Sequence, residues 1–236
     1  MIMSIYKRAL AIVMQKPLKL WGIILLGALL SVVSLTLSGF AIPVLGLSIV
    51  LLFDTSTLMV FLRGYRGEEV NTLQLFECFK DWKTIKRVVL GLGWMYLWIF
   101  LWSLIPVVGP IFAIIRFYEY RLTPYILVME PEVPLTQAIK VSALRTNGYK
   151  AKMFGADILV YVMVYAAIFV AGLIVGLLSA IPLIGALIAL AFCLAVLFIC
   201  LLLPLFVGLV QAAFYEEINA NMNAAFNANP TNFQQF

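Results

Sequence analysis

Four charged residues interrupt segments that are otherwise apolar over the length of a membrane-crossing helix: Asp54, Arg116, Glu119 and Arg121. Charge is costly in hydrocarbon, so such residues mark either a functional polar site or a buried ion pair. Asp54 lies eight residues beyond Gly46, and Arg116 lies seven beyond Gly109, which predicts similar depths in their spans. We expect Arg116 to contact Asp54 or Glu119, with Arg121 nearer the cytoplasmic end. A static pair and a functional polar pathway both remain open.

The sequence offers little for catalysis. Histidine is absent, which excludes Ser-His and Cys-His nucleophile pairs and histidine metal sites. There is no HExxH, P-loop or GxGxxG motif. The paired carboxylates Glu68-Glu69 and Glu216-Glu217 lie at expected helix ends, where charges are ordinarily solvated. We therefore predict no enzyme activity, no catalytic residue, no cofactor and no metal; an intramembrane enzyme is the last of the alternatives.

Two further residue sets bear on binding. Trp94, Trp98 and Trp102 are spaced by four and form one helical stripe, which is either a ligand platform or, more ordinarily, a packing and interface surface. The cysteines form no CxxC pair, and Cys193 and Cys200 fall on one face of an apolar segment as small hydrophobes.

These residues are positioned by a repeated unit. The motif IPxxG occurs three times, at 42–46, 105–109 and 181–185, each time between two long apolar segments. Proline ends a helix and glycine permits a close reversal of the chain, so each copy predicts a tight turn between two spans. The turn residues are Pro43, Gly46, Pro106, Gly109, Pro182 and Gly185.

The composition indicates a membrane protein. The chain has 236 residues, of which 64% are hydrophobic and 11% charged, against about 25% charged in soluble domains. We predict an all-α fold with six transmembrane helices in three pseudo-repeats, each made of an interfacial helix, a span, an IPxxG turn and a span. The expected spans are Leu20 to Leu37, Val44 to Leu62, Val88 to Leu104, Ile111 to Val128, Met153 to Leu178 and Leu183 to Gln211.

The chain divides into a single six-span domain, residues 1–217, and an Asn-rich tail, residues 218–236, which we expect to be flexible. The expected interfacial helices lie at 3–16, at 72–87 and around 135–145. The second begins with a near capping box, in which Asn71 precedes Gln74 by three residues.

Charge predicts the orientation and the partners. Fourteen of the 16 Lys and Arg residues precede the first span or lie in 63–87 and 140–152, whereas the IPxxG turns carry no charge. Positive residues mark the cytoplasmic side, so both termini are expected inside and the three turns outside. The net charge of +5 favours anionic lipids at the cytoplasmic face over nucleic acid.

Gly172, Gly176 and Ala180 follow the small-xxx-small pattern in the expected fifth span. This pattern lets another helix approach closely. The partner is either the sixth span of the same chain or another membrane protein, including a second copy.

Three stretches carry a family resemblance: TPYILVMEPEVPLTQAIKVS, GYKAKMF and QAAFYEEI. They resemble a bacterial family of integral membrane proteins of unknown function (domain of unknown function nine-seven-five), over roughly residues 70–217. The matching positions are Pro124 to Leu127, Ala138, Ile139, Ser142, Gly148, Lys150, Phe154 and Ala213 to Glu217. The family also resembles the membrane region of some glycerophosphodiester phosphodiesterases, whose catalytic domain has no counterpart here.

The resemblance implies a six-span protein of the bacterial cytoplasmic membrane and brings no reaction. Three functions stay open, of which the intramembrane enzyme ranks last. One is a non-enzymatic partner-binding or accessory module, whose polar groups would be paired and without a cavity. Another is a small transporter or a lipid- or peptide-handling protein, including an immunity-type protein, which needs a polar cavity near mid-membrane beside broken helices.

Overall fold

A computed structural model describes residues 2–15, 17–40, 43–179 and 184–228, and within these ranges the chain forms helices and turns, without a β-strand. All the helices are α-helices except η1, a 3₁₀-helix. In chain order they are α1 (Ile2–Gln15), α2 (Pro17–Phe40), α3 (Pro43–Arg66), η1 (Thr72–Phe79), α4 (Trp82–Ser103), α5 (Gly109–Glu119), α6 (Thr123–Met129), α7 (Ala138–Arg145), α8 (Lys150–Leu178) and α9 (Ile184–Ala228). The all-α fold class is confirmed.

Four helices are long and apolar enough to cross a membrane. Their stretches are Val44–Arg66 in α3, Trp82–Ser103 in α4, Lys150–Leu178 in α8 and Gly185–Ala224 in α9. A shorter apolar stretch, Leu20–Thr36, lies in α2. The chain therefore has the helices of a membrane protein, whereas the count of six spans stays a prediction.

The expected fourth span, Ile111 to Val128, is wrong as a single helix. It consists of α5, with 11 residues, and α6, with 7 residues, and neither reaches the roughly 20 residues of a span. Pro124 lies in the first turn of α6. Proline is tolerated there because the first N–H groups of a helix have no intrahelical partner, but it cannot continue a helix from the preceding turn.

The interfacial helix expected at 72–87 is also divided. Its predicted capping box is confirmed, since Asn71 and Gln74 exchange both side-chain-to-backbone hydrogen bonds. η1 ends at Phe79, however, and Asp81 starts a new helix by accepting hydrogen bonds from the N–H groups of Lys83 and Thr84 at 3.2 and 3.1 Å. The second half of the expected surface helix is thus continuous with the following span in α4.

In the sequence, each IPxxG motif stands at the junction of two helices that contact each other: α2 and α3, α4 and α5, and α8 and α9. A Cβ atom on Gly109 would come within 2.8 Å of the Ser103 carbonyl oxygen, and one on Gly185 within 2.5 Å of the Ser179 carbonyl oxygen. Each glycine lies six residues after the serine whose carbonyl oxygen it approaches. The two turns therefore have the same close contact between backbone segments. Gly46 instead lies within α3, which begins at Pro43; Pro182 lies outside the described residues.

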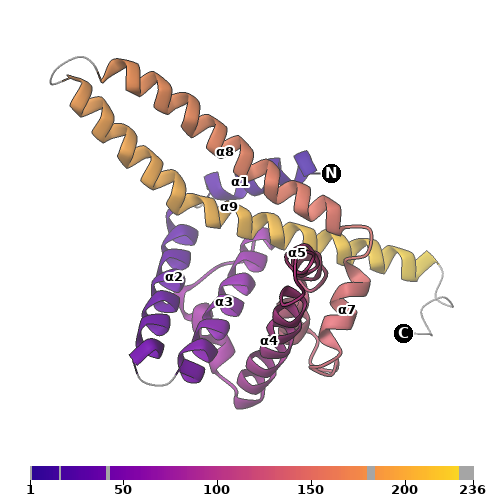
Figure 1. Cartoon of the computed structure of the whole chain (residues 1–236). Helices are drawn as coiled ribbons and strands as arrows, with labels where there is room; N and C mark the ends of the chain where they lie inside the picture. Colours follow the sequence, from indigo (N-terminus) through magenta and orange to yellow (C-terminus); the bar gives the residue numbers. More distant parts are fainter. Residues whose placement is uncertain (1, 16, 41–42, 180–183, 229–236) are drawn as a thin grey trace.

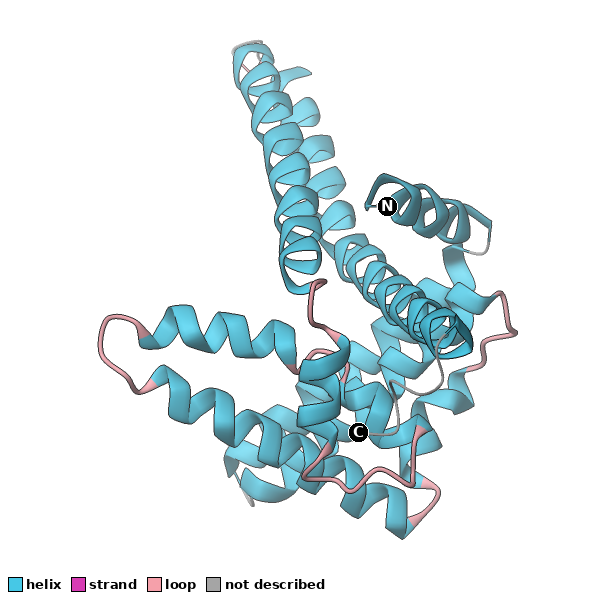
Figure 2. Cartoon of the chain, turned by 90° about the vertical axis from the view of Figure 1, so that its right-hand side faces the viewer, coloured by secondary structure: helices cyan, strands magenta, loops and turns pink. Residues whose placement is uncertain are grey.

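The three hairpins do not point the same way. In Figure 1 the adjoining ends of α8 and α9 lie at the top of the molecule, whereas those of α2 and α3 lie at the bottom; Figure 2 also places the α8–α9 hairpin apart from the other helices. In this arrangement the adjoining ends of α2 and α3 lie at the other end of the molecule from those of α8 and α9 (Figure 1). The topology that charge predicts, with all three turns outside, stays a prediction.

The core lies where α3, α4, α6 and the C-terminal half of α9 meet. The short helix α6 is its centre: Thr123, Tyr125, Ile126 and Leu127 are all buried. The Arg87 side chain, on α4, closes the end of α6 by donating hydrogen bonds to the carbonyl oxygens of Leu127 and Glu130, each at 2.7 Å. Cationic groups stabilise the free carbonyls at a helix C-terminus.

Helix α9 has two parts on either side of Pro204. Before it, Leu197, Phe198 and Leu201 are exposed; after it, Leu205 and Leu209 are buried. The outer part belongs to the projecting α8–α9 hairpin, and the inner part belongs to the core.

The first part of the tail expected from residue 218 is helical. α9 continues to Ala228, Ile218 is buried, and the Asn221 side chain donates a hydrogen bond of 2.7 Å to the Tyr149 hydroxyl. These contacts offset the low intrinsic helix preference of the Asn-rich sequence. Residues 229–236 lie outside the described part.

Candidate functional site

The Ser142 side chain bridges the turn between α5 and α6. Ser142, which is buried on α7, donates a hydrogen bond to the Glu119 carbonyl oxygen at 2.7 Å and accepts one from the Leu122 N–H at 3.2 Å. Its hydroxyl thus joins the last residue of α5 to the residue before α6. Buried backbone N–H and C=O groups outside a helix require hydrogen-bond partners. Ser142 provides a partner on each side of the break and so holds the turn in one conformation.

Arg121, in this turn, forms a buried ion pair with Asp157 on α8. The Nη1 and Nη2 atoms donate to the two carboxylate oxygens at 2.5 and 3.2 Å, and the Tyr118 hydroxyl donates to the same carboxylate at 3.0 Å. The Arg121 side chain is only 7% exposed and that of Asp157 13%. A buried bidentate pair of this kind orients both side chains and leaves no net charge.

Glu119 is shared by two cations. One carboxylate oxygen accepts a hydrogen bond from Arg116, and the other accepts one from Lys150 of α8 at 2.6 Å. The Arg116 guanidinium also lies over the Trp102 ring, 4.9 Å from its centroid. One carboxylate between two cations leaves a local excess of positive charge on this side of α5.

Asp54 lies in the middle of α3, and its recorded hydrogen bond comes from the Ser31 hydroxyl at 3.0 Å. No Lys or Arg of the described side chains lies within salt-bridge distance of it. The isolated chain leaves this carboxylate exposed. Asp54 is therefore a carboxylate without a basic partner among the described side chains.

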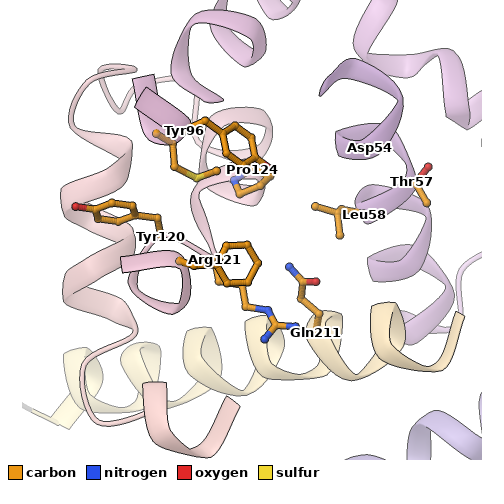
Figure 3. A pocket seen from close by; sticks show the side chains of 10 residues that line it. Asp54, Thr57, Leu58, Tyr96, Tyr120, Arg121, Pro124 and Gln211 are labelled. Carbon is orange, nitrogen blue, oxygen red and sulfur yellow. The ribbon is translucent and has the colours of Figure 1, made fainter. Parts of the chain in front are cut away.

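Asp54 and Arg121 line one cavity of about 300 Å³ between α3, α4, the α5–α6 turn and α9. In Figure 3, Leu58 and Gln211 extend from α3 and α9 toward the turn that carries Tyr120 and Arg121. Apolar walls with few polar groups are typical of small-ligand sites. The lining residues are Asp54, Thr57, Leu58, Met95, Tyr96, Phe117, Tyr120, Arg121, Pro124 and Gln211.

The expected polar cluster is thus divided into three. Arg116 meets Glu119, as expected, and does not meet Asp54. Arg121 joins neither acid and pairs with Asp157 instead. Arg121 and Asp54 nevertheless border the same cavity.

Sequence reasoning missed several members of the site. Asp157 and Lys150 were available as signals, because they are the charges at the start of the long apolar fifth segment. Tyr96 and Gln211 carry no local signal, since a tyrosine within an apolar run and a glutamine at the end of one are both common. In the described part of the chain, no group of three or more Cys, Asp or Glu side chains is placed to hold a metal ion.

The small-residue stripe is only partly engaged. A Cβ atom on Gly172 would lie 3.5 Å from the Phe192 ring on α9, so this position faces the neighbouring helix as expected. Gly176 has open space instead, with nothing within 4 Å of a Cβ position. Ala180 lies outside the described residues.

The residues that carry the family resemblance meet around the α5–α6 break. The ring of Tyr125 stacks on that of Tyr215 with centroids 4.4 Å apart, while Ser142 and Lys150 bind Glu119. Comparison with protein-family models, with curated proteins and with solved structures found no match. The family assignment therefore stays a prediction.

Proposed function

We propose that this chain is a non-enzymatic protein of the bacterial cytoplasmic membrane that binds a small amphipathic ligand with a cationic group, as a small transporter or a lipid- or peptide-handling protein does. The observation that carries the proposal is Asp54, a carboxylate without a basic partner among the described side chains, at the edge of a cavity of about 300 Å³. A fully paired accessory module would need no such cavity.

The charge of the cavity supports a cationic ligand. Arg121 borders the cavity but is neutralised by Asp157, whereas Asp54 has only the Ser31 hydroxyl. An isolated carboxylate in a medium of low polarity is stabilised by an opposite charge, so an ammonium group would gain more there than a phosphate or carboxylate. Tyr96 and Gln211 add polar contacts, and Leu58, Met95 and Phe117 suit an apolar chain.

The helix break supports ligand handling as well. The α5–α6 turn contributes Tyr120 and Arg121 to the wall of the cavity. Broken helices beside a central cavity recur in membrane transporters, where irregular backbone is tolerated because it lines a polar space.

The test compares octylammonium with octyl sulfate as probes of the purified protein in a mild neutral detergent. Binding to the folded state raises the melting temperature. We expect octylammonium to raise it for the wild type by several degrees more than octyl sulfate does. Asp54→Asn should abolish this difference, whereas the exposed control Glu132→Gln should keep it. Equal responses of wild type and Asp54→Asn to octylammonium would contradict the proposal.

A partner-binding or accessory role is the second candidate, supported by the α8–α9 hairpin. In the most apolar stretches of α8 and α9, 6% and 0% of the residues are buried within the chain, far less than the 50% in the corresponding stretch of α3. Such faces suit lipid or another membrane protein. Single-molecule mass measurement in nanodiscs tests this role, because a second copy or a co-purified partner raises the mass above one chain of 26.3 kDa.

A further inference from the structure

A second cavity shares Tyr120 with the Asp54 cavity, because Tyr120 lines both. It has a volume of about 580 Å³ and lies between α4, α5 and the segment 136–143. Its apolar wall is the tryptophan stripe of α4, formed by Trp94, Trp98 and Trp102. Its polar wall contains Arg116, Lys140, Thr136 and Gln137.

This second cavity is a groove, and the charge of its lining is positive. Two basic side chains and no acidic one line it. Lys140 is exposed and forms no ion pair with the described acids, and Arg116 shares its single carboxylate, Glu119, with Lys150. The groove therefore repels cations and attracts an anion, in contrast to the Asp54 cavity.

The tryptophan stripe specifies the rest of the ligand. Trp94 and Trp98 pack edge to face with ring centroids 5.8 Å apart, and both remain more than one-third exposed. Three indoles spaced by four residues extend over roughly 12 Å of helix, the length of a long acyl segment. Indole rings favour the boundary between hydrocarbon and headgroups, where an apolar chain and a polar group meet. A small free anion would not need this surface.

We propose that the groove between α4 and the segment 136–143 binds an anionic phospholipid, with Lys140 and Arg116 at its phosphate and an acyl chain along Trp94, Trp98 and Trp102. This site is separate from the Asp54 cavity and does not depend on the function proposed for it. Basic residues are attracted to an anionic leaflet in general. The groove would add a specific binding site for one lipid molecule to this general attraction.

The experiment uses tryptophan quenching by brominated lipids. The protein contains five tryptophans, so Trp21→Phe and Trp82→Phe leave the three groove indoles as reporters. The purified protein is reconstituted with brominated phosphatidylglycerol or brominated phosphatidylcholine diluted into unlabelled phosphatidylcholine. We expect half-maximal quenching at about a tenfold lower mole fraction of the anionic lipid, because a charge-assisted contact in a partly buried groove discriminates by about this factor.

Matched variants separate a site from a general surface effect. Lys140→Gln should remove most of the preference, whereas Lys152→Gln, which removes an exposed lysine on α8 outside the groove, should leave it unchanged. Asp54→Asn should also leave it unchanged, so failure here is distinguishable from failure of the proposed function. Equal quenching by both lipids, or a wild-type preference in Lys140→Gln, would overturn the proposal. Loss of the preference on adding millimolar inorganic phosphate, at constant ionic strength, would reassign the groove to a free anion.

Discussion

The hydroxyl of Ser142 donates a hydrogen bond to the carbonyl oxygen of Glu119, 23 residues earlier in the chain, at 2.7 Å. Ser142 belongs to α7, and Glu119 ends α5, so this contact joins a surface helix to the broken helix that borders the Asp54 cavity. The same hydroxyl accepts a hydrogen bond from the Leu122 N–H at 3.2 Å. Ser142 thus contacts the backbone on both sides of the break.

Ser142→Ala is expected to destabilise the protein by about 1–3 kcal/mol, because the Leu122 N–H would lose its partner in a buried place. The Glu119 carbonyl oxygen would still accept a hydrogen bond from the Thr146 hydroxyl at 3.1 Å. The loss of stability therefore comes mainly from the unpaired Leu122 N–H. Thermal unfolding in detergent measures the effect. Ser103→Ala is the matched control, since its exposed hydroxyl bonds only within α4, to the Phe100 carbonyl oxygen. Equal losses for the two variants would contradict the role of Ser142.

The buried Arg121–Asp157 pair is expected to show strong coupling. Asp157→Leu alone strands a guanidinium that is 7% exposed, and breaking such a pair costs about 3–5 kcal/mol. Asp157→Leu combined with Arg121→Leu should recover much of this loss, as measured by a double-mutant cycle on unfolding. The Arg66–Glu216 pair, whose side chains are about one-third exposed, serves as a control with a coupling of at most about 1 kcal/mol. Additive losses at Arg121 and Asp157 would show that the pair is not coupled.

Gly172 and Gly176 are expected to respond differently to leucine. Gly172→Leu places extra atoms against Phe192, and overpacking of this kind costs about 1–3 kcal/mol. Gly176→Leu meets open space in the single chain, so its melting temperature should stay near that of the wild type. If a second copy packs on this face, Gly176→Leu should instead lower the dimer fraction in nanodiscs. A large loss of monomer stability at Gly176 would mean that another element of the chain covers it.

Cys78 is expected to resist thiol reagents. It is 1% exposed, and burial raises the pKa of its thiol above the ordinary value, so less thiolate is present at any given pH. In a Cys193→Ser, Cys200→Ser background, a water-soluble maleimide at pH 7 should modify Cys78 only after unfolding, as followed by mass spectrometry. Raising the pH through the ordinary thiol pKa should accelerate labelling of the exposed control Lys80→Cys before that of Cys78. Rapid labelling of native Cys78 would contradict its burial.

The topology can be tested at the three turns. Val44→Cys, Val108→Cys and Ile184→Cys, each in a background without other cysteines, should all react with an impermeant reagent from outside the cell, because the intervening connections carry the positive charges. The diverging hairpins in Figure 1 make this a sharp test. Labelling of Val44→Cys and Ile184→Cys from opposite sides would replace the three-repeat topology with one that follows the diverging packing.

The sequence by itself determined the features that depend on near neighbours along the chain. Apolar length predicted four helices that are long and apolar enough to cross a membrane, Asn71 and Gln74 predicted a capping box, and Gly109 and Gly185 predicted close turns. The contact between Arg116 and Glu119 could also be predicted from the sequence, because residues three apart share a helix face.

Only the tertiary structure decided which distant groups meet. The partner of Arg121 is 36 residues away on α8, and the side chain that bridges the α5–α6 break comes from α7. Asp54 has no basic partner among the described side chains, because Arg116 of α5 pairs with Glu119 and Arg121 of the following turn pairs with Asp157. Helical periodicity fixes which face a residue occupies, but it carries no information on which helix that face will meet. The separation of charge, with the unpaired Asp54 in one cavity and Arg116 and Lys140 in the groove that shares Tyr120 with it, is therefore a product of packing.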